Sequence, residues 1–253
     1  MTTIISYGIG TDSTACILLM MAKREPPPHA ILSADTGGER SYTYDYLKMF
    51  SAFIQRYGWP AITVVRRQRR DKSWKSLEQD CLDRNALPSV AYGWKTCSQS
   101  YKVAPQDKWA NSDAHCKVEW KAGRKITKII GYNFDETKRA SFGEDKKYIR
   151  RYPLIEWEIG KEKAKWVIER AGLPLPGKSA CFFCPHAKVP EIKKLAVEYP
   201  DLAQRALAIE AGAKLTKIKG LGRRFAWADV LRDHNFAPVE DPFDEEPCGC
   251  YDG

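Results

Sequence analysis

The first 65 residues alternate between short apolar runs and helix-forming segments, and this alternation constrains the fold more than any other feature of the chain. The apolar runs lie at residues 3–7, 29–34 and 61–65, and the helix-forming segments lie at 13–23 and 43–56. Such alternation favours parallel strands, because a chain that returns to the same end of a sheet needs a crossover helix. With a further strand expected at 128–131, the sequence predicts an α/β fold with a doubly wound, mostly parallel sheet and helices on both faces.

The pattern changes after about residue 156. Helical periods occur at 162–171 and 190–211, a loop rich in Pro and Gly lies at 173–178, and acidic residues gather at 240–246. This predicts an α/β domain at residues 1–156, followed at 157–253 by a helical part that carries cysteines and an acidic tail.

Composition limits the class of protein. The longest apolar stretch, residues 15–22, is far shorter than the roughly 20 residues that cross a bilayer, and the first residues lack the basic segment of a secretory signal. We therefore expect a cytoplasmic protein without a membrane segment. Lys and Arg number 41 against 32 Asp and Glu, which gives a net charge of +9. This excess fits either a nucleic-acid or nucleotide partner or a basic, solvated surface.

Residues 6–14, Ser-Tyr-Gly-Ile-Gly-Thr-Asp-Ser-Thr, connect the first predicted strand to the first predicted helix. Gly8 and Gly10 let backbone N–H groups approach an anion, and the helix N-terminus favours negative charge. Ser13 and Thr14 can cap the helix or bind phosphate oxygens. The segment has neither the Gly-Lys-Ser/Thr of a Walker loop nor the third glycine of a dinucleotide-binding fold. It is either a phosphate loop or a tight strand-to-helix turn.

Asp35, Thr36 and Gly37 follow the second predicted strand. Asp35 can cap the next helix, and it can also reach a ribose or organise a metal-bound phosphate. The carboxyl ends of neighbouring parallel strands converge on one crevice. Position therefore favours a functional role for these residues beside the first loop.

The chain has eight cysteines, and in a reducing compartment close cysteine pairs indicate metal or redox chemistry. Cys181 and Cys184 form a Cys-x-x-Cys motif with two phenylalanines between them, and Cys248 and Cys250 lie near the C-terminus. A Cys-x-x-Cys pair suits a shared metal centre, a redox dithiol or half of a zinc site.

Several of these segments resemble one family. The first loop resembles the PP-loop, Ser-Gly-Gly-x-Asp-Ser, with matches at Gly8, Gly10, Asp12 and Ser13, while Ile9 stands at a position where glycine is usual. Residues 31–39 resemble the Asp-Thr-Gly segment of proteins like phosphoadenosine phosphosulfate (PAPS) reductase. Residues 131–139 resemble a Gly-x-x-x-x-Glu-x-x-Arg segment of the same family, in which the arginine faces phosphates. The alternative for Glu136 and Arg139 is a surface ion pair.

The cysteines extend the resemblance. Residues 97–105 are similar to the Cys-Cys-x-x-Arg-Lys-x-x-Pro segment of sulfonucleotide reductases that carry a 4Fe-4S cluster, with Ser98 and Tyr101 as departures. This implies that Cys97, Cys181 and Cys184 are cluster ligands. The fourth ligand is then Cys248 or Cys250, or one iron is left open. The alternative is a zinc ion bound by the four cysteines at 181, 184, 248 and 250.

The resemblance implies an enzyme that binds ATP and Mg²⁺, adenylates an acceptor and transfers sulfur or nitrogen to it. A nucleic-acid base is an acceptor that suits the basic charge, and a sulfur donor would be needed. The alternatives are a sulfonucleotide reductase that uses a thiol reductant and releases sulfite, and a non-catalytic binder with structural zinc. The Cys248-Gly249 segment lacks the Glu and His of the reductase tail, Glu-Cys-Gly-x-His, and this favours the first reading.

These motifs supply the candidate residues. Catalytic roles are expected for Asp12, Ser13, Asp35 and Lys102. Nucleotide contacts are expected from Ser6, Gly8, Gly10, Asp12, Ser13, Thr14, Asp35, Thr36, Gly37, Glu136 and Arg139. Metal ligands are expected at Cys97, Cys181, Cys184, Cys248 and Cys250.

Overall fold

Five parallel strands form the central sheet of the computed structural model, which describes residues 2–69, 71, 73–142 and 145–232. The strands of this described part are β1 (Thr3–Ser6), β2 (Ala30–Asp35), β3 (Ile62–Arg66), β4 (Ile126–Ile130) and β5 (Tyr148–Arg151). Their order is β3-β2-β1-β4-β5, and each neighbouring pair is parallel. The predicted α/β fold class is confirmed.

The strand order reverses direction at β1. The chain first moves from β1 through β2 to β3 at one edge, and then returns to the other side of β1 for β4 and β5. Ser6 is level with Leu32 on β2 and with Ile130 on β4, so the three central strands end close to one another. In an open α/β sheet the ligand crevice lies at this switch point, outside the carboxyl ends of the strands.

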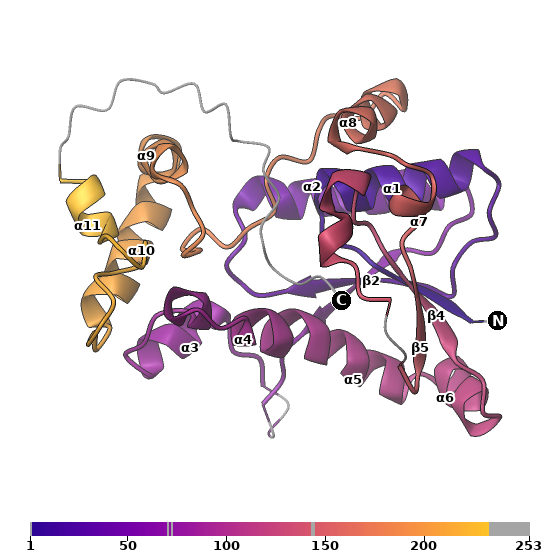
Figure 1. Ribbon diagram of the computed structural model, residues 1–253, viewed down its shortest axis with the longest axis horizontal. Helices are drawn as coiled ribbons and strands as arrows, with labels where there is room; N and C mark the ends of the chain where they lie inside the picture. The colour runs from indigo at the N-terminus through magenta and orange to yellow at the C-terminus, as the bar shows by residue number, and fades with distance from the viewer. Residues whose placement is uncertain (1, 70, 72, 143–144, 233–253) are drawn as a thin grey trace.

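Helices cover both faces of the sheet (Figure 1). One face packs against α1 (Thr11–Ala22) and α2 (Ser41–Gln55), with α8 (Lys161–Arg170) packed on α1, and the other packs against α5 (Ala104–Ser112) and α6 (Ala114–Lys121). Because side chains alternate along a strand, Ile5 and Ile31 face the first set of helices, whereas Ile4 and Leu32 face the second. Both faces are buried, which explains why the strands are apolar without alternation.

A second group of helices lies to one side of the sheet, at the left in Figure 1. It consists of α3 (Leu77–Asp83), α9 (Val189–Glu198), α10 (Pro200–Gly212) and α11 (Trp227–Val230), which share one apolar cluster. The predicted helical region 190–211 is two helices, because Pro200 has no N–H to continue α9 and Tyr199 before it adopts a non-helical conformation. The division of the chain at residues 156 and 157 stays a prediction.

A π-helical turn interrupts the long helix that leads into α5. The helix begins at α4 (Thr96–Ser98), passes through the π turn η2 (Gln99–Val103) and continues as α5. Ala104 N–H bonds to the carbonyl of Gln99, five residues back, and Pro105 has no N–H to donate. Such turns are frequent at functional sites, and this one carries the predicted site residue Lys102.

The remaining short elements are two 3-10 helices, η1 (Ser89–Tyr92) and η3 (Phe134–Arg139), and the helix α7 (Pro153–Glu156). Among the residues that the structure describes, none of the helices combines the length and apolarity that crossing a membrane requires.

Candidate functional site

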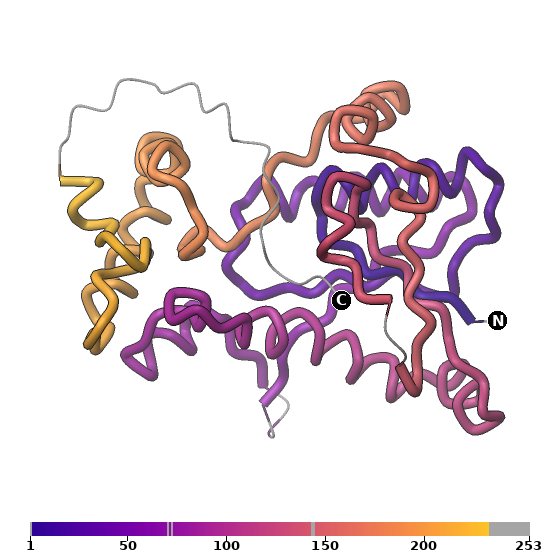
Figure 2. Tube along the Cα trace, viewed as in Figure 1, coloured from indigo at the N-terminus to yellow at the C-terminus, as the bar shows by residue number. Residues whose placement is uncertain are grey.

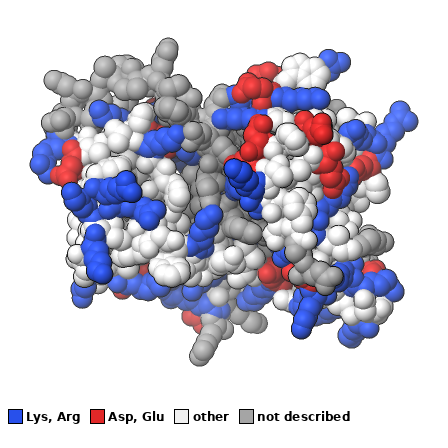
Figure 3. Space-filling view, viewed as in Figure 1, with Lys and Arg blue, Asp and Glu red and all other residues white. Residues whose placement is uncertain are grey.

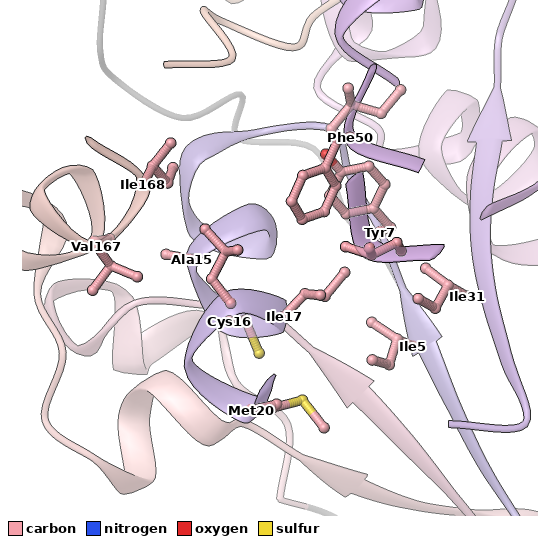
Figure 4. Packing of buried hydrophobic residues seen from close by; sticks show 14 of the residues in the cluster. Ile5, Tyr7, Ala15, Cys16, Ile17, Met20, Ile31, Phe50, Val167 and Ile168 are labelled. Atoms are coloured by element: carbon pink, nitrogen blue, oxygen red, sulfur yellow. The ribbon is translucent and has the colours of Figure 1, made fainter. Parts of the chain in front are cut away.

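The loop from β1 to α1 is anchored by Tyr7. Its N–H donates to the carbonyl of Leu32 (2.8 Å), its ring stacks on Phe50 (5.4 Å between centroids), and its hydroxyl lies 3.0 Å from Thr14 Oγ1 (Figure 4). Thr14 is fully buried. Its hydroxyl therefore stabilises the loop from inside, although the sequence predicted a nucleotide contact there.

Gly10 caps α1 with an extended backbone (φ −106°, ψ 174°). Ser13 Oγ donates to the Gly10 carbonyl (3.1 Å) and accepts from the Gly10 N–H (3.3 Å). The first N–H groups of a helix have no partner within it, so the start of α1 offers donors and the positive end of the helix dipole. The strand, glycine and helix arrangement predicted for this loop is present, with α1 starting at Thr11.

Ile9 is in the left-handed region, with φ 59°, although it is β-branched. Its side chain is buried in the core cluster that contains Tyr7 and Ile17. A β-branched residue rarely adopts this conformation, and strain of this kind gathers at ligand clamps and active sites. The loop thus keeps a glycine-like backbone at the position where the PP-loop has glycine.

Two loops meet at the switch point. A Cβ on Gly131, just after β4, would lie 2.7 Å from Ser13 Cα, so only glycine fits between β4 and α1. Asn133 Nδ2 donates to Asp12 Oδ2 (2.9 Å), and burial together with the nearby Glu136 carboxylate raises the pKa of Asp12 to about 7. The loops after β1 and β4 therefore form one structure.

Glu136 and Arg139 form an ion pair (2.6 Å) beside this junction. The Arg139 guanidinium also lies over the Tyr132 ring, 4.4 Å from its centroid. Its positive charge offsets part of the rise in the pKa of Asp12. The ion pair is present, with side chains 23% and 20% exposed, and it lies beside Asp12 at the start of α1. A role for Glu136 and Arg139 in binding phosphates stays a prediction.

Asp35 at the end of β2 is buried and accepts three hydrogen bonds. Its donors are the Gly37 N–H (2.7 Å), the Tyr44 hydroxyl (2.9 Å) and Arg66 Nε (2.8 Å). Gly37 has φ 73°, which favours glycine, and the turn is therefore shaped around this carboxylate. In this arrangement Asp35 organises the end of β2.

The segment before α9 crosses the sheet end and binds to the turn after β2 (Figure 2). Phe182 N–H donates to the Gly38 carbonyl (2.8 Å), Cys181 Sγ lies 3.2 Å from Thr36 Oγ1, and Ser179 Oγ lies 3.5 Å from Glu39 Oε2. The cysteine motif thus lies next to the predicted nucleotide-binding turn, although Thr36 and Cys181 are 145 residues apart in the sequence.

These elements enclose a polar pocket. The lining includes Tyr7, Gly8 and Ile9 of the first loop with Ser33 and Ala34 of β2. The other lining residues are Glu39, Lys102, Gln106 and Ser179. Sequence reasoning identified Gly8 and Lys102. It missed Glu39, Gln106 and Ser179, although Glu39 follows the Asp-Thr-Gly-Gly segment and Ser179 precedes Cys181 by two residues.

The other predicted nucleotide contacts lie around this pocket. Ser6 ends β1 and is buried, while Gly10, Asp12 and Ser13 begin the adjoining helix. Thr36 accepts the Gly38 N–H (3.2 Å) in the turn after β2. The structure therefore brings the candidates from three separate strand ends into one region.

The cysteines are less closely gathered. Within the described ranges, no three or more His, Cys, Asp or Glu side chains are arranged to hold a metal ion. Cys97 and Cys181 both pack against the apolar cluster that contains Phe182 and Phe183. Cys184, which follows Phe183 in the sequence, is also buried. Cys248 and Cys250 lie outside the described residues. The shared metal centre stays a prediction.

No protein-family model and no curated protein matches the chain. Eighteen chains of solved structures match it, among them a reductase and a thiolase. A phosphoadenylyl-sulfate (PAPS) reductase from Candida auris, in a phosphate complex, is 18% identical over 69% of this chain and 73% of its own, with a TM-score of 0.44. The U34-tRNA thiolase NcsA from Methanococcus maripaludis, with its [4Fe-4S] cluster, is 15% identical over 94% of this chain and 82% of its own, also with a TM-score of 0.44.

The identities and TM-scores are too low to transfer an activity, a substrate or a cofactor. The site is therefore defined by the geometry of this chain's own residues: a strained glycine-containing loop and a helix start, joined to the β4 loop, beside a buried polar pocket.

Proposed function

We propose that this chain is a PP-loop enzyme that binds ATP, adenylates an acceptor and passes sulfur or nitrogen to it. The observation that carries the proposal is the junction at the switch point, where Asn133 binds Asp12 and Gly131 packs on Ser13. Ligands of open α/β sheets bind at this position, and a helix N-terminus preceded by glycines is a site for phosphates.

The charges near the loop suit a nucleotide with Mg²⁺. Lys102 lines the pocket and supplies a positive charge, and Arg139 lies near Asp12. Asp12 has a raised pKa, so it is readily protonated near neutral pH and then presents no charge to a phosphate. Bound Mg²⁺ would favour the ionised carboxylate instead and would neutralise the phosphates.

The chemistry we propose has two steps. An acceptor oxygen attacks the α-phosphorus of ATP, the bond to the β-phosphate oxygen breaks, and pyrophosphate leaves. A sulfur or nitrogen nucleophile from a donor then displaces AMP from the acceptor. Backbone N–H groups at the start of α1 would stabilise the charge that develops on the phosphates.

A nucleic-acid base is the acceptor that the surface charge favours. The chain has a net charge of +9. At the left of the face in Figure 3, where α9, α10 and α11 lie, Lys and Arg atoms (blue) are more abundant than Asp and Glu atoms (red). Contacts of this kind bind phosphates irrespective of sequence and weaken with salt.

The metal centre is part of the proposal only as a ligand set. Thiolates suit iron–sulfur clusters and zinc alike, and Cys97, Cys181 and Cys184 would supply three of them. Among the described residues, the cysteine thiols are not close enough together to bind one metal ion, so no step of the proposed reaction is assigned to a cluster.

The deciding assay incubates the protein with labelled ATP and Mg²⁺, with and without tRNA or DNA, and follows AMP and pyrophosphate. We expect release of AMP that nucleic acid stimulates. The affinity for nucleic acid should fall with salt, with a log–log slope of about −0.9 for each phosphate neutralised on duplex DNA. Sulfite release from a sulfonucleotide with a thiol reductant, without AMP from ATP, would establish the reductase reading instead. Nucleotide binding with neither product would indicate a non-catalytic binder.

Gly10→Val tests nucleotide binding at the loop without disturbing the fold. A Cβ at Gly10 has no atom within 4 Å, and its backbone angles are allowed for any residue. The variant should therefore fold, but its side chain would occupy the space in which we place the phosphates. Unchanged nucleotide affinity in this variant would contradict binding at the loop.

A further inference from the structure

An exposed tryptophan lies next to the loop that follows α10. Trp94 is 71% exposed, although tryptophan has the largest apolar side chain. The Lys214 N–H donates to the Asn85 carbonyl (2.9 Å), and a Cβ on Gly93 would lie 3.5 Å from Arg223 Nη2. The turn that carries Trp94 and the loop after α10 therefore lie side by side, although about 120 residues separate them in the sequence.

The loop after α10 is strongly basic. Residues 214–224 include five Lys or Arg and no Asp or Glu. All five are exposed, and within the described part of the chain none of them forms an ion pair. The exposed acids that flank the two segments in the sequence are already paired, Asp83 with Lys75 (2.7 Å) and Asp229 with Arg232 (2.6 Å). The positive charge of the loop is thus available to an external anion.

A buried carboxylate fixes the shape of this loop. Glu210 on α10 accepts hydrogen bonds from the N–H groups of Leu221 (2.6 Å), Trp227 (2.9 Å) and Ala228 (2.9 Å). A Cβ on Gly220 would overlap the Glu210 carboxylate, so only glycine fits there. The loop is therefore ordered in the free protein, and binding does not have to pay for ordering it.

The backbone of Trp94 is held in the same way. The Trp94 N–H donates to the Ser89 carbonyl (3.0 Å), and the Cys97 N–H donates to Ser89 Oγ (2.8 Å). Gly93 between them has φ 89°, a conformation that favours glycine. The chain is thus anchored on both sides of Trp94, while the indole ring remains exposed to solvent.

We propose that these two segments bind a nucleic acid at unpaired nucleotides, with a base stacked on the Trp94 ring and the neighbouring phosphates on the cations. The residues that form this Trp94 surface are Trp94, Lys95, Lys217, Lys219, Arg223 and Arg224. An aromatic ring next to a basic groove is the arrangement that binds single strands, because every base has a face that can stack. A base inside a duplex is already stacked, so the ring adds nothing there. The choice of a nucleic acid rests on the proposed function, in which it supplies the acceptor.

The Trp94 surface is connected to the candidate site by one helix. This helix begins at Thr96, two residues after Trp94, and passes through the π turn that carries Lys102. Lys102 lines the polar pocket beside the phosphate loop. A strand bound at the Trp94 surface would therefore lie at the start of the helix that leads to the proposed nucleotide site.

The test measures fluorescence anisotropy on the full chain with three labelled probes. These are an unstructured RNA oligonucleotide of about 20 nucleotides, the same sequence as single-stranded DNA, and the RNA annealed to its complement. Trp94→Ala should weaken binding of both single strands roughly tenfold, because stacking on one aromatic ring is lost, and should change duplex binding less than about twofold. Trp94→Phe, which keeps a ring, should recover most of the affinity. The tighter of the two single strands identifies the source of the unpaired nucleotides.

Matched controls separate stacking from charge. Trp166 is 51% exposed on α8 with the Arg170 guanidinium 5.0 Å from its ring centroid, so Trp166→Ala also removes an exposed tryptophan beside a cation. It should leave all three affinities unchanged. Arg223→Gln should weaken all three probes and lower the salt slope by about one, since a phosphate contact is lost. Lys163→Gln, an exposed change on α8, should do neither.

The outcomes distinguish this inference from the proposed function. Equal losses for single strands and duplex in Trp94→Ala, or no loss for either in a variant that circular dichroism shows to be folded, would overturn the stacking role. Failure of folded wild type to bind any probe would overturn the surface. Displacement of the RNA by poly-glutamate as readily as by unlabelled RNA would identify a site for acidic polypeptides instead. Single-strand binding that depends on Trp94, with no AMP formed from ATP, would support the surface and contradict the proposed function alone.

Discussion

Asn133 donates a hydrogen bond from Nδ2 to Asp12 Oδ2 over 2.9 Å and so joins two loops 121 residues apart. The two loops follow β1 and β4, the strands between which the sheet order reverses. Asp12 is held in a partly buried position by this bond. Burial, and next the Glu136 carboxylate, raise its pKa to about 7 from a usual value of 3.8.

The raised pKa predicts a pH-dependent stability. Between about pH 4 and pH 7 the folded state binds more protons at Asp12 than the unfolded state does, so stability falls as the pH rises through this window. Asp12→Asn cannot ionise and should be more stable than wild type at pH 8 by a few kcal/mol, at about 1.36 kcal/mol for each pKa unit, with little difference at pH 4. Urea unfolding at both pH values measures this. The exposed Asp45→Asn is the control, and a difference that does not grow with pH would contradict the prediction.

Gly131 provides a second prediction about the junction. Gly131→Ala would place a Cβ 2.7 Å from Ser13 Cα and 3.0 Å from its nitrogen, so β4 and α1 must separate. We expect a loss of about 1–3 kcal/mol of stability and weaker nucleotide binding than wild type. Gly212→Ala at the end of α10 is the matched control, because its Cβ would meet nothing within 4 Å. Equal melting temperatures for the two variants would show that the contact is not tight.

Hydrophobic periodicity was sufficient to predict most of the strands and the helices α1, α2 and α8. The strands β1 to β4 and the helices α1, α2 and α8 were expected within a few residues of their observed bounds. β5 was missed because Tyr148–Arg151 is an edge strand of only four residues, two of them arginine. The helices α3, α5 and α6 were not predicted either. α5 contains only one large apolar residue, Trp109, so its periodicity is weak, and tertiary contacts outweigh the weak local signal.

The site was predicted in part because motifs report only the residues near them. Gly8 and Lys102 belong to recognisable segments, and both line the pocket. Gln106 has no motif of its own, and it lines the pocket from the first turn of α5, directly after the π turn. Thr14 was predicted to contact the nucleotide because it follows the matched position Ser13, yet its hydroxyl faces Tyr7 in the core, since position in sequence does not show to which side a helical residue points.

The cysteine prediction is tested by metal content. Cys97→Ser, Cys181→Ser and Cys184→Ser should each lower the metal content of anaerobically purified protein, and its stability with it, because metal binding and folding are linked. Iron and an absorbance near 400 nm would indicate a cluster, and zinc would indicate the alternative. Cys116→Ala, in the core between α6 and the sheet, should lose stability without losing metal. Full metal content in Cys97→Ser with loss in Cys181→Ser would show that Cys97 is not a ligand.

The last prediction concerns the strained backbone of Ile9. At φ 59° any side chain clashes with its own backbone at a cost of roughly 1–2 kcal/mol, and only glycine avoids it. Ile9→Gly and Ile9→Ala both lose the buried side chain, but only the glycine variant also loses the strain. Ile9→Gly should therefore be the more stable of the two by about 1 kcal/mol.

Ile17, fully buried in the middle of α1, is the control. There the order should invert, with Ile17→Ala more stable than Ile17→Gly by about 1 kcal/mol, because glycine is disfavoured inside a helix. Chemical unfolding of the four variants measures both differences. The same order at both positions would mean that Ile9 is not strained, and that the loop has the glycine-like backbone without cost.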